Sequence, residues 1–259
     1  MKKPLLEVLF MSEKRKGVLL LLQDGEKEMK FLLSTLNTTR QALLPQIRIL
    51  EEHYLVSHSK DSYELTMIGK LIVDNMASVL NIVEALDIDY WGNHDISFMP
   101  PHLLKRIDEI GKCELINPLI TDIYAFNNQF HGYSRNSKYV YMITSVYHPD
   151  ALELIADLIS NNINFYLISS SELHDRVMKE KYSEVVKLTQ NKLAHLFVYP
   201  KTMPFQFISF NECHIMLSLL KNNGEPDINY ILCESKNALE WGKELFEYYL
   251  KDSTPVTDL

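Results

Sequence analysis

Long apolar runs are absent from this chain of 259 residues. Even residues 18–22, an unbroken apolar segment, number only five, whereas a membrane-spanning helix needs roughly 18. Glu7 interrupts the apolar start of the chain, which therefore lacks the continuous core of a secretion signal. We expect a cytoplasmic protein that makes no membrane contact.

The glycine and histidine motifs of common enzymes are missing too. The eight glycines come no closer than eight positions apart, at Gly17 and Gly25, which excludes the GxGxxG, GxSxG and GxxxxGK signatures. No HExxH motif occurs, and no HxxxH pair falls on a predicted helix, so the case for zinc is weak. We therefore expect no catalytic residues, no metal and no cofactor.

Cysteine is scarce. Cys113, Cys213 and Cys233 form no CxxC motif, and three cysteines cannot all pair with one another. We expect them to be small buried apolar side chains. A redox sensor is the alternative.

Positive charge is in short supply and unevenly distributed. The net charge of the chain is −8. Residues 1–70 hold 11 Lys and Arg against 9 Asp and Glu, a balance of +2, whereas residues 71–259 hold 15 against 25, a balance of −10. An acidic body repels phosphate and would direct the mildly basic N-terminal part toward a polyanion.

What the N-terminal sequence does contain is a run of helix signals followed by a hairpin. Ser12 and Thr39 are suitable N-caps, and Asp24-Gly25 is a stop. The predicted helices cover 12–23, 26–35 and 39–53, and the predicted strands cover 55–59 and 63–66. Three helices followed by a hairpin are typical of a winged helix-turn-helix. Pro45 lies within the third helix and predicts a kink or a loosened first turn there.

A long helix over 67–86 comes next, and the pattern then changes to alternating strands and helices. The strands are predicted over 113–116, 138–144, 164–168, 195–199, 205–210, 215–219 and 230–233, the helices over 149–160, 172–188 and 237–249, and a loose tail over 252–259. The fold class is therefore α/β overall, of the α+β kind, with a mixed sheet. We expect a winged helix-turn-helix over 1–68, a linking helix and hinge over 69–110, and an α/β effector-sensing domain over 111–259.

The third predicted helix carries residues suited to contacting DNA. In a helix-turn-helix this element enters the major groove, and its first turns meet the base edges. Thr39, Arg40 and Gln41 open the helix, and Arg48 lies on the same outer side two turns later. Arg suits guanine and Gln suits adenine, while Lys60 at the wing tip suits a phosphate. Each residue alone is equally consistent with an ordinary solvated surface.

Two resemblances follow from the residues themselves. Residues 36–70, with LEEHYLV and YELTMIGK, resemble archaeal ArsR/MarR-type winged helices, in which Tyr54 would usually be Gly. Residues 90–116, 143–159 and 238–250 are similar to the middle domain of the archaeal methanogenesis regulatory proteins. That resemblance implies transcriptional control, with the body as a sensing domain. Archaeal sugar-sensing regulators of this layout are related to phospholipase D, but the HxK of His58 lacks the HxKxxxxD aspartate, since position 65 is Leu.

Two clusters in the body could bind a small-molecule effector. Trp91, His94 and Asp95 combine a flat apolar wall with donors and acceptors. Tyr147 and His148 precede a predicted helix, where ligands often bind. We expect the two clusters to line or border one site. A purely structural role, as a hinge between domains or a helix start, is the alternative for each.

The long helix has a heptad seam typical of a homodimer. Ile68, Ile72, Asn75, Val79, Ile82 and Leu86 recur at spacings of 4, 3, 4, 3 and 4. Asn75 would pair with its copy across a two-fold axis. The same seam could instead pack on the winged helix or on the body of its own chain.

Together these features predict a homodimeric regulator that binds double-stranded DNA at a palindromic operator. Two alternatives stay open. One is a phosphoester- or nucleotide-processing enzyme that its winged helix recruits to DNA. The other is a protein-interaction adaptor whose winged helix no longer reads DNA.

Overall fold

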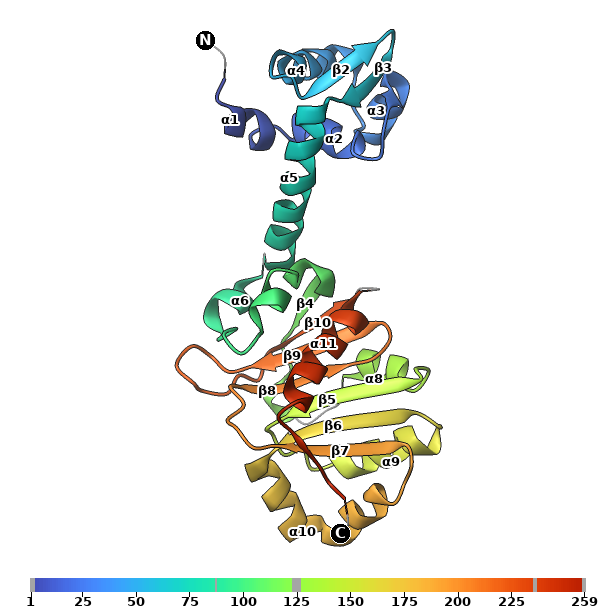
Figure 1. The fold of residues 1–259 in the computed structure, drawn as a ribbon, viewed down its shortest axis with the longest axis vertical. Coiled ribbons are helices and arrows are strands. Elements are labelled where there is room, and N and C mark those ends of the chain that lie inside the picture. The colour runs from blue at the N-terminus through green and yellow to red at the C-terminus, as the bar shows by residue number, and fades with distance from the viewer. Residues whose placement is uncertain (1–2, 87, 123–126, 235–236, 258–259) are drawn as a thin grey trace. The chain divides into compact units, whose positions relative to one another are not determined.

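The computed structural model describes residues 3–86, 88–122, 127–234 and 237–257, and the chain divides into two compact units, Met1–Asn81 and Ile82–Leu259 (Figure 1). Each unit is built around a hydrophobic cluster of its own. The three-part division into 1–68, 69–110 and 111–259 stays a prediction. Over the described residues no helix has the length and apolar character needed to cross a membrane.

The first unit is a winged helix-turn-helix, as predicted. Its helices are α1 (Leu5–Phe10), α2 (Glu13–Leu21), α3 (Met29–Thr35), α4 (Arg40–Glu52) and the beginning of α5 (Met67–Leu86). Its strands β1 (Lys27–Glu28), β2 (Val56–Ser59) and β3 (Ser62–Leu65) form an antiparallel sheet in the order β1-β3-β2. Leu43, Ile47 and Leu50 of α4 recur every three or four residues and are fully buried, which holds α4 on the core.

Three details of this unit differ from the sequence expectations. The second predicted helix begins at Met29 rather than residue 26, because Lys27 and Glu28 pair with β3 instead. The short helix α1 was not predicted. Pro45 does not interrupt α4, which is one helix with Pro45 exposed inside it.

The junction between α4, the wing and α5 explains the motif LEEHYL…LTMIG. Tyr54 has a φ of 59°, and the amides of Tyr54 and Leu55 donate to the carbonyls of Glu51 and Leu50, so α4 ends in a Schellman motif. Thr66 caps α5 by accepting from the amide of Gly69 at 3.0 Å. A Cβ added to Gly69 would lie 2.0 Å from the carbonyl oxygen of Leu55. Only glycine therefore fits where α5 crosses this carbonyl.

The second unit contains an eight-stranded mixed sheet in the order β11-β7-β6-β5-β8-β9-β10-β4. The strands are β4 (Lys112–Ile116), β5 (Tyr139–Thr144), β6 (Asn164–Ser170), β7 (Ala194–Tyr199), β8 (Phe205–Phe210), β9 (His214–Leu219), β10 (Tyr230–Glu234) and β11 (Thr254–Pro255). The pairs β5·β6 and β6·β7 are parallel and the others antiparallel. The mixed α/β fold class is thereby confirmed.

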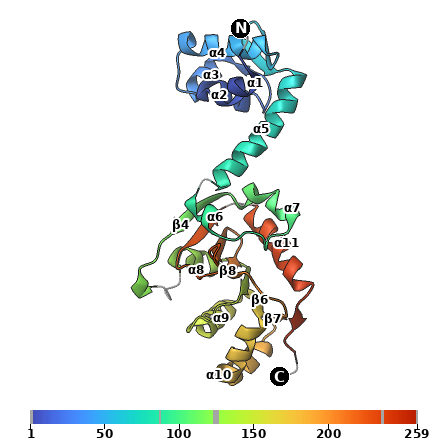
Figure 2. The ribbon, with the colours of Figure 1, turned by 90° about the vertical axis from the view of Figure 1, so that its left-hand side faces the viewer.

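Helices cover both faces of this sheet (Figure 2). The unit contains α6 (Asp89–Asn93), α7 (Pro101–Leu104), α8 (Asn128–Ser134), α9 (Ala151–Ser160), α10 (Ser171–Thr189), α11 (Ala238–Leu250) and the 3-10 turns η1 (Ile107–Ile110) and η2 (Ile120–Asp122). Ile143 and Ile168 pack in the cluster of Trp241 from α11, whereas Val140 and Phe165 pack with α9. This alternation is expected, because successive strand side chains point to opposite faces.

Two expectations for this unit were wrong. Cys113 and Cys233 face each other in the β4·β10 register and form a disulfide, and Cys213 is exposed, so none of the three is simply a small buried hydrophobe. The tail is not loose throughout, because Thr254 and Pro255 pair with β7. Proline is tolerated there because β11 is an edge strand.

The α4–α5 junction predicts opposite effects of two substitutions on the stability of the first unit. Gly69→Ala should lower the free energy of unfolding of the first unit by about 1–3 kcal/mol, because the added methyl group meets a backbone carbonyl that cannot move aside. Tyr54→Gly should raise it by about 1 kcal/mol, because glycine adopts the left-handed conformation without a Cβ penalty. Urea unfolding of the two variants measures both, and a stabilising Gly69→Ala would contradict the described contact.

Candidate functional site

The first candidate site is the exposed N-terminal turn of α4. Thr39 caps the helix by accepting from the amide of Ala42, and Thr39, Arg40 and Gln41 are all exposed. The partial positive charge of a helix N-terminus adds to the positive charge of Arg40. This turn therefore has donors for a phosphate and side chains of the kind that contact bases.

Arg40 is paired with an acidic residue that was not singled out from the sequence. Its guanidinium donates two hydrogen bonds to the carboxylate of Asp61, at 2.5 and 3.2 Å. Both side chains are about half exposed. The hydrogen bond and negative charge of Asp61 raise the pKa of Arg40. The residue best suited to contact guanine thus already has a bidentate partner.

Asp61 belongs to the wing turn, which also carries Lys60. Ser59 pairs with Ser62, so Lys60 and Asp61 form a two-residue loop in which Lys60 has a φ of 58°. The carbonyl of Asp61 also accepts from the amide of Met29 at 2.9 Å. Asp61 therefore links the wing turn to both α3 and α4. Lys60 is exposed at this turn, as predicted for a wing tip.

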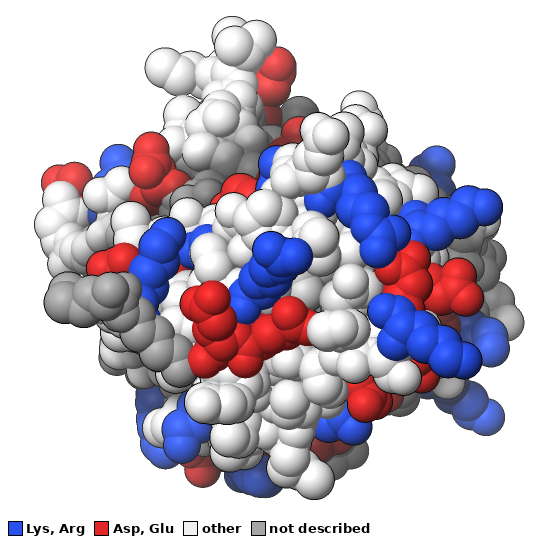
Figure 3. Space-filling model, turned by 90° about the horizontal axis from the view of Figure 1, so that it is seen from above, with Lys and Arg blue, Asp and Glu red and all other residues white. Residues whose placement is uncertain are grey.

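Arg48 is exposed farther along α4. Burial raises the pKa of Tyr63 on β3, as does Asp61, and the positive charge of Arg48 makes the smallest of the opposing contributions. Figure 3 shows basic and acidic side chains interspersed on the face it displays, rather than one continuous basic surface.

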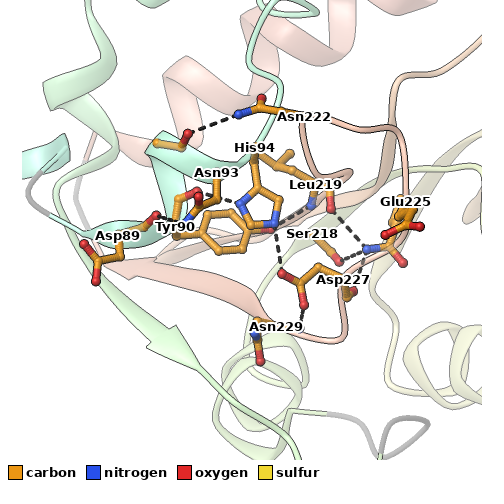
Figure 4. Close-up of polar contacts among 12 residues, drawn as sticks. Asp89, Tyr90, Asn93, His94, Ser218, Leu219, Asn222, Glu225, Asp227 and Asn229 are labelled. Atoms are coloured by element: carbon orange, nitrogen blue, oxygen red, sulfur yellow. Dashed lines mark hydrogen bonds and ion pairs between the residues drawn. The ribbon is translucent and has the colours of Figure 1, made fainter.

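The second candidate site is a polar pocket in the second unit, with a volume of about 460 Å³. It lies between α6 and the loop that joins β9 to β10 (Figure 4). Its lining is rich in amides and charged groups: Asp89, Tyr90, Asn93, His94, Leu115, Lys221, Asn222, Asn223, Asp227 and Asn229. Such convergence of polar groups is a feature of ligand pockets.

His94 lies at the wall of this pocket and is 5% exposed. Its Nδ1 is 2.6 Å from the carbonyl of Tyr90 and its Nε2 is 3.1 Å from the carboxylate of Asp227. Both partners are acceptors, and either ring nitrogen can donate when it carries the proton. The ring also stacks on Tyr90 at 3.8 Å, and burial raises the pKa of Tyr90.

Hydrogen bonds fasten the pocket to the sheet. The hydroxyl of Tyr90 accepts from the amide of Leu219 at 2.8 Å. The side-chain amide of Gln206 on β8 donates to the carbonyl of Asp227 at 2.7 Å, and the backbone carbonyl of Gln206 accepts from the amide of Ser145. A chain of polar contacts therefore runs from the end of β5 to the His94 pair. Asp227 and Gln206 could not be predicted from the sequence, because no local pattern connects them with His94.

Of the five residues predicted to bind an effector, only His94 lines this pocket. Trp91 is buried in the core and donates from its indole to the carbonyl of Ala85. Asp95 accepts from the amide of Ser97. Tyr147 stacks under Arg176 at 4.2 Å, and His148 Nδ1 accepts from the amide of Asp150. Among the described residues, no three His, Cys, Asp or Glu side chains are arranged to hold a metal.

The predicted dimer residues divide between two environments. Ile72 is half-buried against the core of the first unit, and Ile82 packs against the core of the second. Asn75 and Val79 are exposed, and the Asn75 amide donates to the carbonyl of Leu71. A continuous exposed stripe on α5 does exist, but it differs slightly from the predicted seam. Its members are Ile68, Leu71, Asn75, Val79 and Val83.

Solved structures similar to this chain share little sequence with it. That of TrmBL2, described as an archaeal chromatin protein, is 12% identical, covers 97% of each chain and has a TM-score of 0.45. That of Nuc, a phospholipase D family member from Salmonella typhimurium, is 8% identical, covers 50% of this chain and 90% of its own, and has a TM-score of 0.36. Neither similarity is close enough to bear on function.

The sequence comparisons are more specific. The methanogenesis regulatory protein FilR1 of Methanothrix harundinacea (strain 6Ac) is 23% identical over 255 residues, which are 95% of this chain and 57% of that protein. The FilR1 N-terminal domain model matches residues 3–84, and the FilR1 middle domain model matches residues 123–252. The chain therefore belongs to the methanogenesis regulatory protein FilR1 family.

Proposed function

We propose that the chain is a DNA-binding transcriptional regulator that contacts double-stranded DNA with α4 and the wing. The main support is that the run Thr39-Arg40-Gln41 at the N-terminus of α4 is exposed and lies directly beside the wing turn. Membership of a regulatory family supports this proposal. The chain spans only 57% of its curated relative, so the activity of a longer protein is part of the proposal.

In this proposal Asp61 moderates the affinity for DNA. Arg40 exchanges its carboxylate partner for a guanine edge or a phosphate when DNA binds. Gln41 contacts a neighbouring base, while Lys60 and Arg48 contact the phosphate backbone. The carboxylate of Asp61 then lies close to the polyanion without its partner, which costs affinity. Such a cost favours sites where Arg40 makes a bidentate base contact over sites where it meets only phosphate.

The Arg40–Asp61 pair yields a test of DNA binding. Arg40→Ala should weaken binding to the preferred site by about 1–3 kcal/mol, or roughly 5- to 150-fold, if the contact is to a base. Asp61→Asn should strengthen binding to all sequences, because it removes a negative charge and releases Arg40. Fluorescence anisotropy with a selected site and a scrambled site measures both changes.

The matched control is Arg135→Ala, which removes an arginine that is similarly exposed and paired with Asp157 in the second unit. It should leave DNA affinity unchanged. If Arg40→Ala behaves like this control, α4 does not contact DNA through its first turn. Equal losses on both sequences would assign Arg40 to phosphate rather than to a base.

We further propose that two copies associate through the exposed stripe of α5. Ile68, Leu71, Val79 and Val83 are each more than half exposed, which is unusual for large apolar side chains at one helix face. Asn75 in the middle of the stripe would face its copy across the two-fold axis. A dimer of this kind would present two α4 helices about one DNA turn, roughly 34 Å, apart and favour a palindromic site.

The dimer proposal is tested by the mass of the free chain in solution. Val79→Glu combined with Val83→Glu should convert a dimer to a monomer at tens of micromolar, because buried like charges would oppose association. Asn81→Glu, on another face of α5, is the control and should leave the mass unchanged. Sedimentation equilibrium gives the answer, and a monomeric wild-type chain would refute the proposal.

The pocket around His94 is proposed to bind a small polar effector. Its amide-rich lining and its position at α6, immediately after α5, support a sensing role. Trp91 and Asp95 would then support the pocket from behind, and Tyr147 and His148 would act at most from its border. A phosphoester- or nucleotide-processing enzyme would instead turn over a substrate. A protein-interaction adaptor would not bind DNA.

Filling the pocket tests the effector proposal. Asn93→Leu combined with Asn229→Leu should leave the DNA affinity of the purified chain within about twofold, because neither residue lies in the DNA-binding unit. The same variant should hold target transcripts at one level across growth conditions in cells. Asn136→Leu, an exposed asparagine outside the pocket lining, is the control. A normal transcriptional response in the filled variant would contradict the proposal.

A further inference from the structure

A disulfide bond joins the two strands at one end of the eight-stranded sheet. Cys113 of β4 and Cys233 of β10 lie directly opposite each other in the antiparallel register, although 120 positions separate them in the sequence. The third cysteine, Cys213, is free and exposed. The disulfide therefore adds a covalent connection between two strands that are already hydrogen-bonded to each other.

Strand β4 has few other attachments to the sheet. It is the edge strand, and no described strand other than β10 pairs with it (Figure 1). Its residues Lys112 and Glu114 are exposed, Leu115 and Ile116 are partly exposed, and Cys113 alone is buried. Packing energy grows with the apolar area that is buried. The cysteine side chain is therefore the main link between β4 and the core.

The two bonded strands also carry part of the lining of the His94 pocket. Leu115 lies two positions beyond Cys113 on β4, and Asn229 lies directly before β10; both line the pocket. In the sheet register Leu115 faces Ile231, the neighbouring pair to the one that forms the disulfide on this face. The disulfide thus holds together two strands that border the proposed effector site.

A disulfide is unusual in a protein that binds DNA. Cellular thiols keep cysteines reduced in the compartments where DNA is transcribed, and the disulfides that do form there are usually transient or redox-sensing. The proposed DNA binding therefore favours a bond that forms and breaks during the working life of the protein.

We propose that the bond between Cys113 and Cys233 is a redox switch, which fixes β4 to β10 when oxidised and releases it when reduced. The inference rests on the proposed function in two respects. DNA binding places the chain among reducing thiols, and the His94 pocket connects β4 with effector binding. The reaction itself requires neither DNA nor effector.

The reductant is a dithiol, either a small molecule or a protein. Its thiolate attacks Sγ of Cys113, because Cys113 is 9% exposed at the sheet edge whereas Cys233 is fully buried. The sulfur of Cys233 leaves as a thiolate and takes up a proton, and a mixed disulfide remains on Cys113. The second thiol of the reductant then displaces Cys113 as a thiol. Two electrons and two protons pass to the chain, and the reductant becomes a disulfide.

Reduction should make β4 the least stable strand of the sheet. It leaves β4 attached by its backbone hydrogen bonds to β10 and by little buried surface. Segments with few buried contacts open at a low cost in free energy. Opening of β4 withdraws Leu115 from the pocket lining, so the reduced chain should bind the proposed effector more weakly than the oxidised chain.

The first test measures whether the bond is reduced in the folded chain. The full chain is equilibrated in buffers of different ratios of reduced to oxidised glutathione, and its free thiols are alkylated and counted by mass spectrometry. We expect a change from one free thiol to three as the ratio rises, without denaturant. A structural disulfide would resist reduction by glutathione and would yield only one free thiol at every ratio.

The second test measures hydrogen exchange of the backbone amides in the oxidised and the reduced chain. Reduction should speed exchange of the β4 amides that bond to β10 by about tenfold or more. The amides of β6, a central strand, should exchange equally in the two states. Cys113→Ala should show the fast exchange of β4 in every buffer, because it cannot form the bond.

Cys213→Ala is the matched control, since it removes the cysteine outside the disulfide. It should keep both the thiol change, now from none to two, and the change in exchange. The switch is overturned if the folded chain stays oxidised at every glutathione ratio, or if β4 exchanges alike in both states. Neither readout involves DNA, so absence of DNA binding in both redox states would contradict the proposed function and leave these results unaffected.

Discussion

The geometry of the proposed DNA-contacting surface depends on one residue of the wing turn, Asp61, which forms hydrogen bonds with two other segments. Its carbonyl accepts from the amide of Met29 at the start of α3, and its carboxylate accepts two hydrogen bonds from Arg40 at the start of α4. The wing turn is thus tied to the two helices of the helix-turn-helix. The same carboxylate neutralises Arg40, the cation that opens α4. Asp61 therefore determines both the geometry of this surface and its charge.

That pairing also fits the modest charge of the first unit. Residues 1–70 carry a balance of only +2, so in the proposed complex long-range attraction to DNA would be weak and binding would depend on a few short-range contacts. An arginine that must leave a carboxylate gains most from a partner that replaces both hydrogen bonds, as a guanine edge does. The proposed regulator thereby gains selectivity at the expense of affinity.

In the second unit, polar contacts link loops that lie far apart in the sequence. His94 and Asp227 are separated by 133 positions and meet at 3.1 Å, and Gln206 joins the Asp227 loop to the end of β5. A second network joins Asn211 to the backbone of His214 and to the side chain of Ser134 on α8. Such long-range contacts fix the loops around the proposed effector pocket.

Local patterns predicted most of the elements but few of the partners. The helix over 67–86 and the strand over 205–210 have the predicted limits, because apolar periodicity and capping act within one segment. Residues 27–28 escaped prediction because a two-residue strand exists only through its pairing with β3. The same holds for the disulfide of Cys113 and Cys233, 120 positions apart.

In the candidate sites, too, local features could be predicted and long-range partners could not. Arg40 and Lys60 could be placed from the sequence, because a helix N-terminus and a hairpin turn are local features. Asp61 as the partner of Arg40 and Asp227 as the partner of His94 could not, because each depends on contacts made only after the chain has folded. Tyr147 and His148 illustrate the converse, since a promising local pattern places neither residue in the lining of the His94 pocket.

Recognition of specific DNA by the first unit is the main proposal. The most direct test is to sequence the genomic fragments that the purified chain retains, and to titrate the best fragment with salt. We expect enrichment of one shared palindromic motif. The logarithm of the binding constant should fall with the logarithm of the salt concentration, with a slope that corresponds to the release of only a few ions, because few cations contact phosphate. Retention of fragments without any shared motif, or of no DNA at low salt, would contradict it.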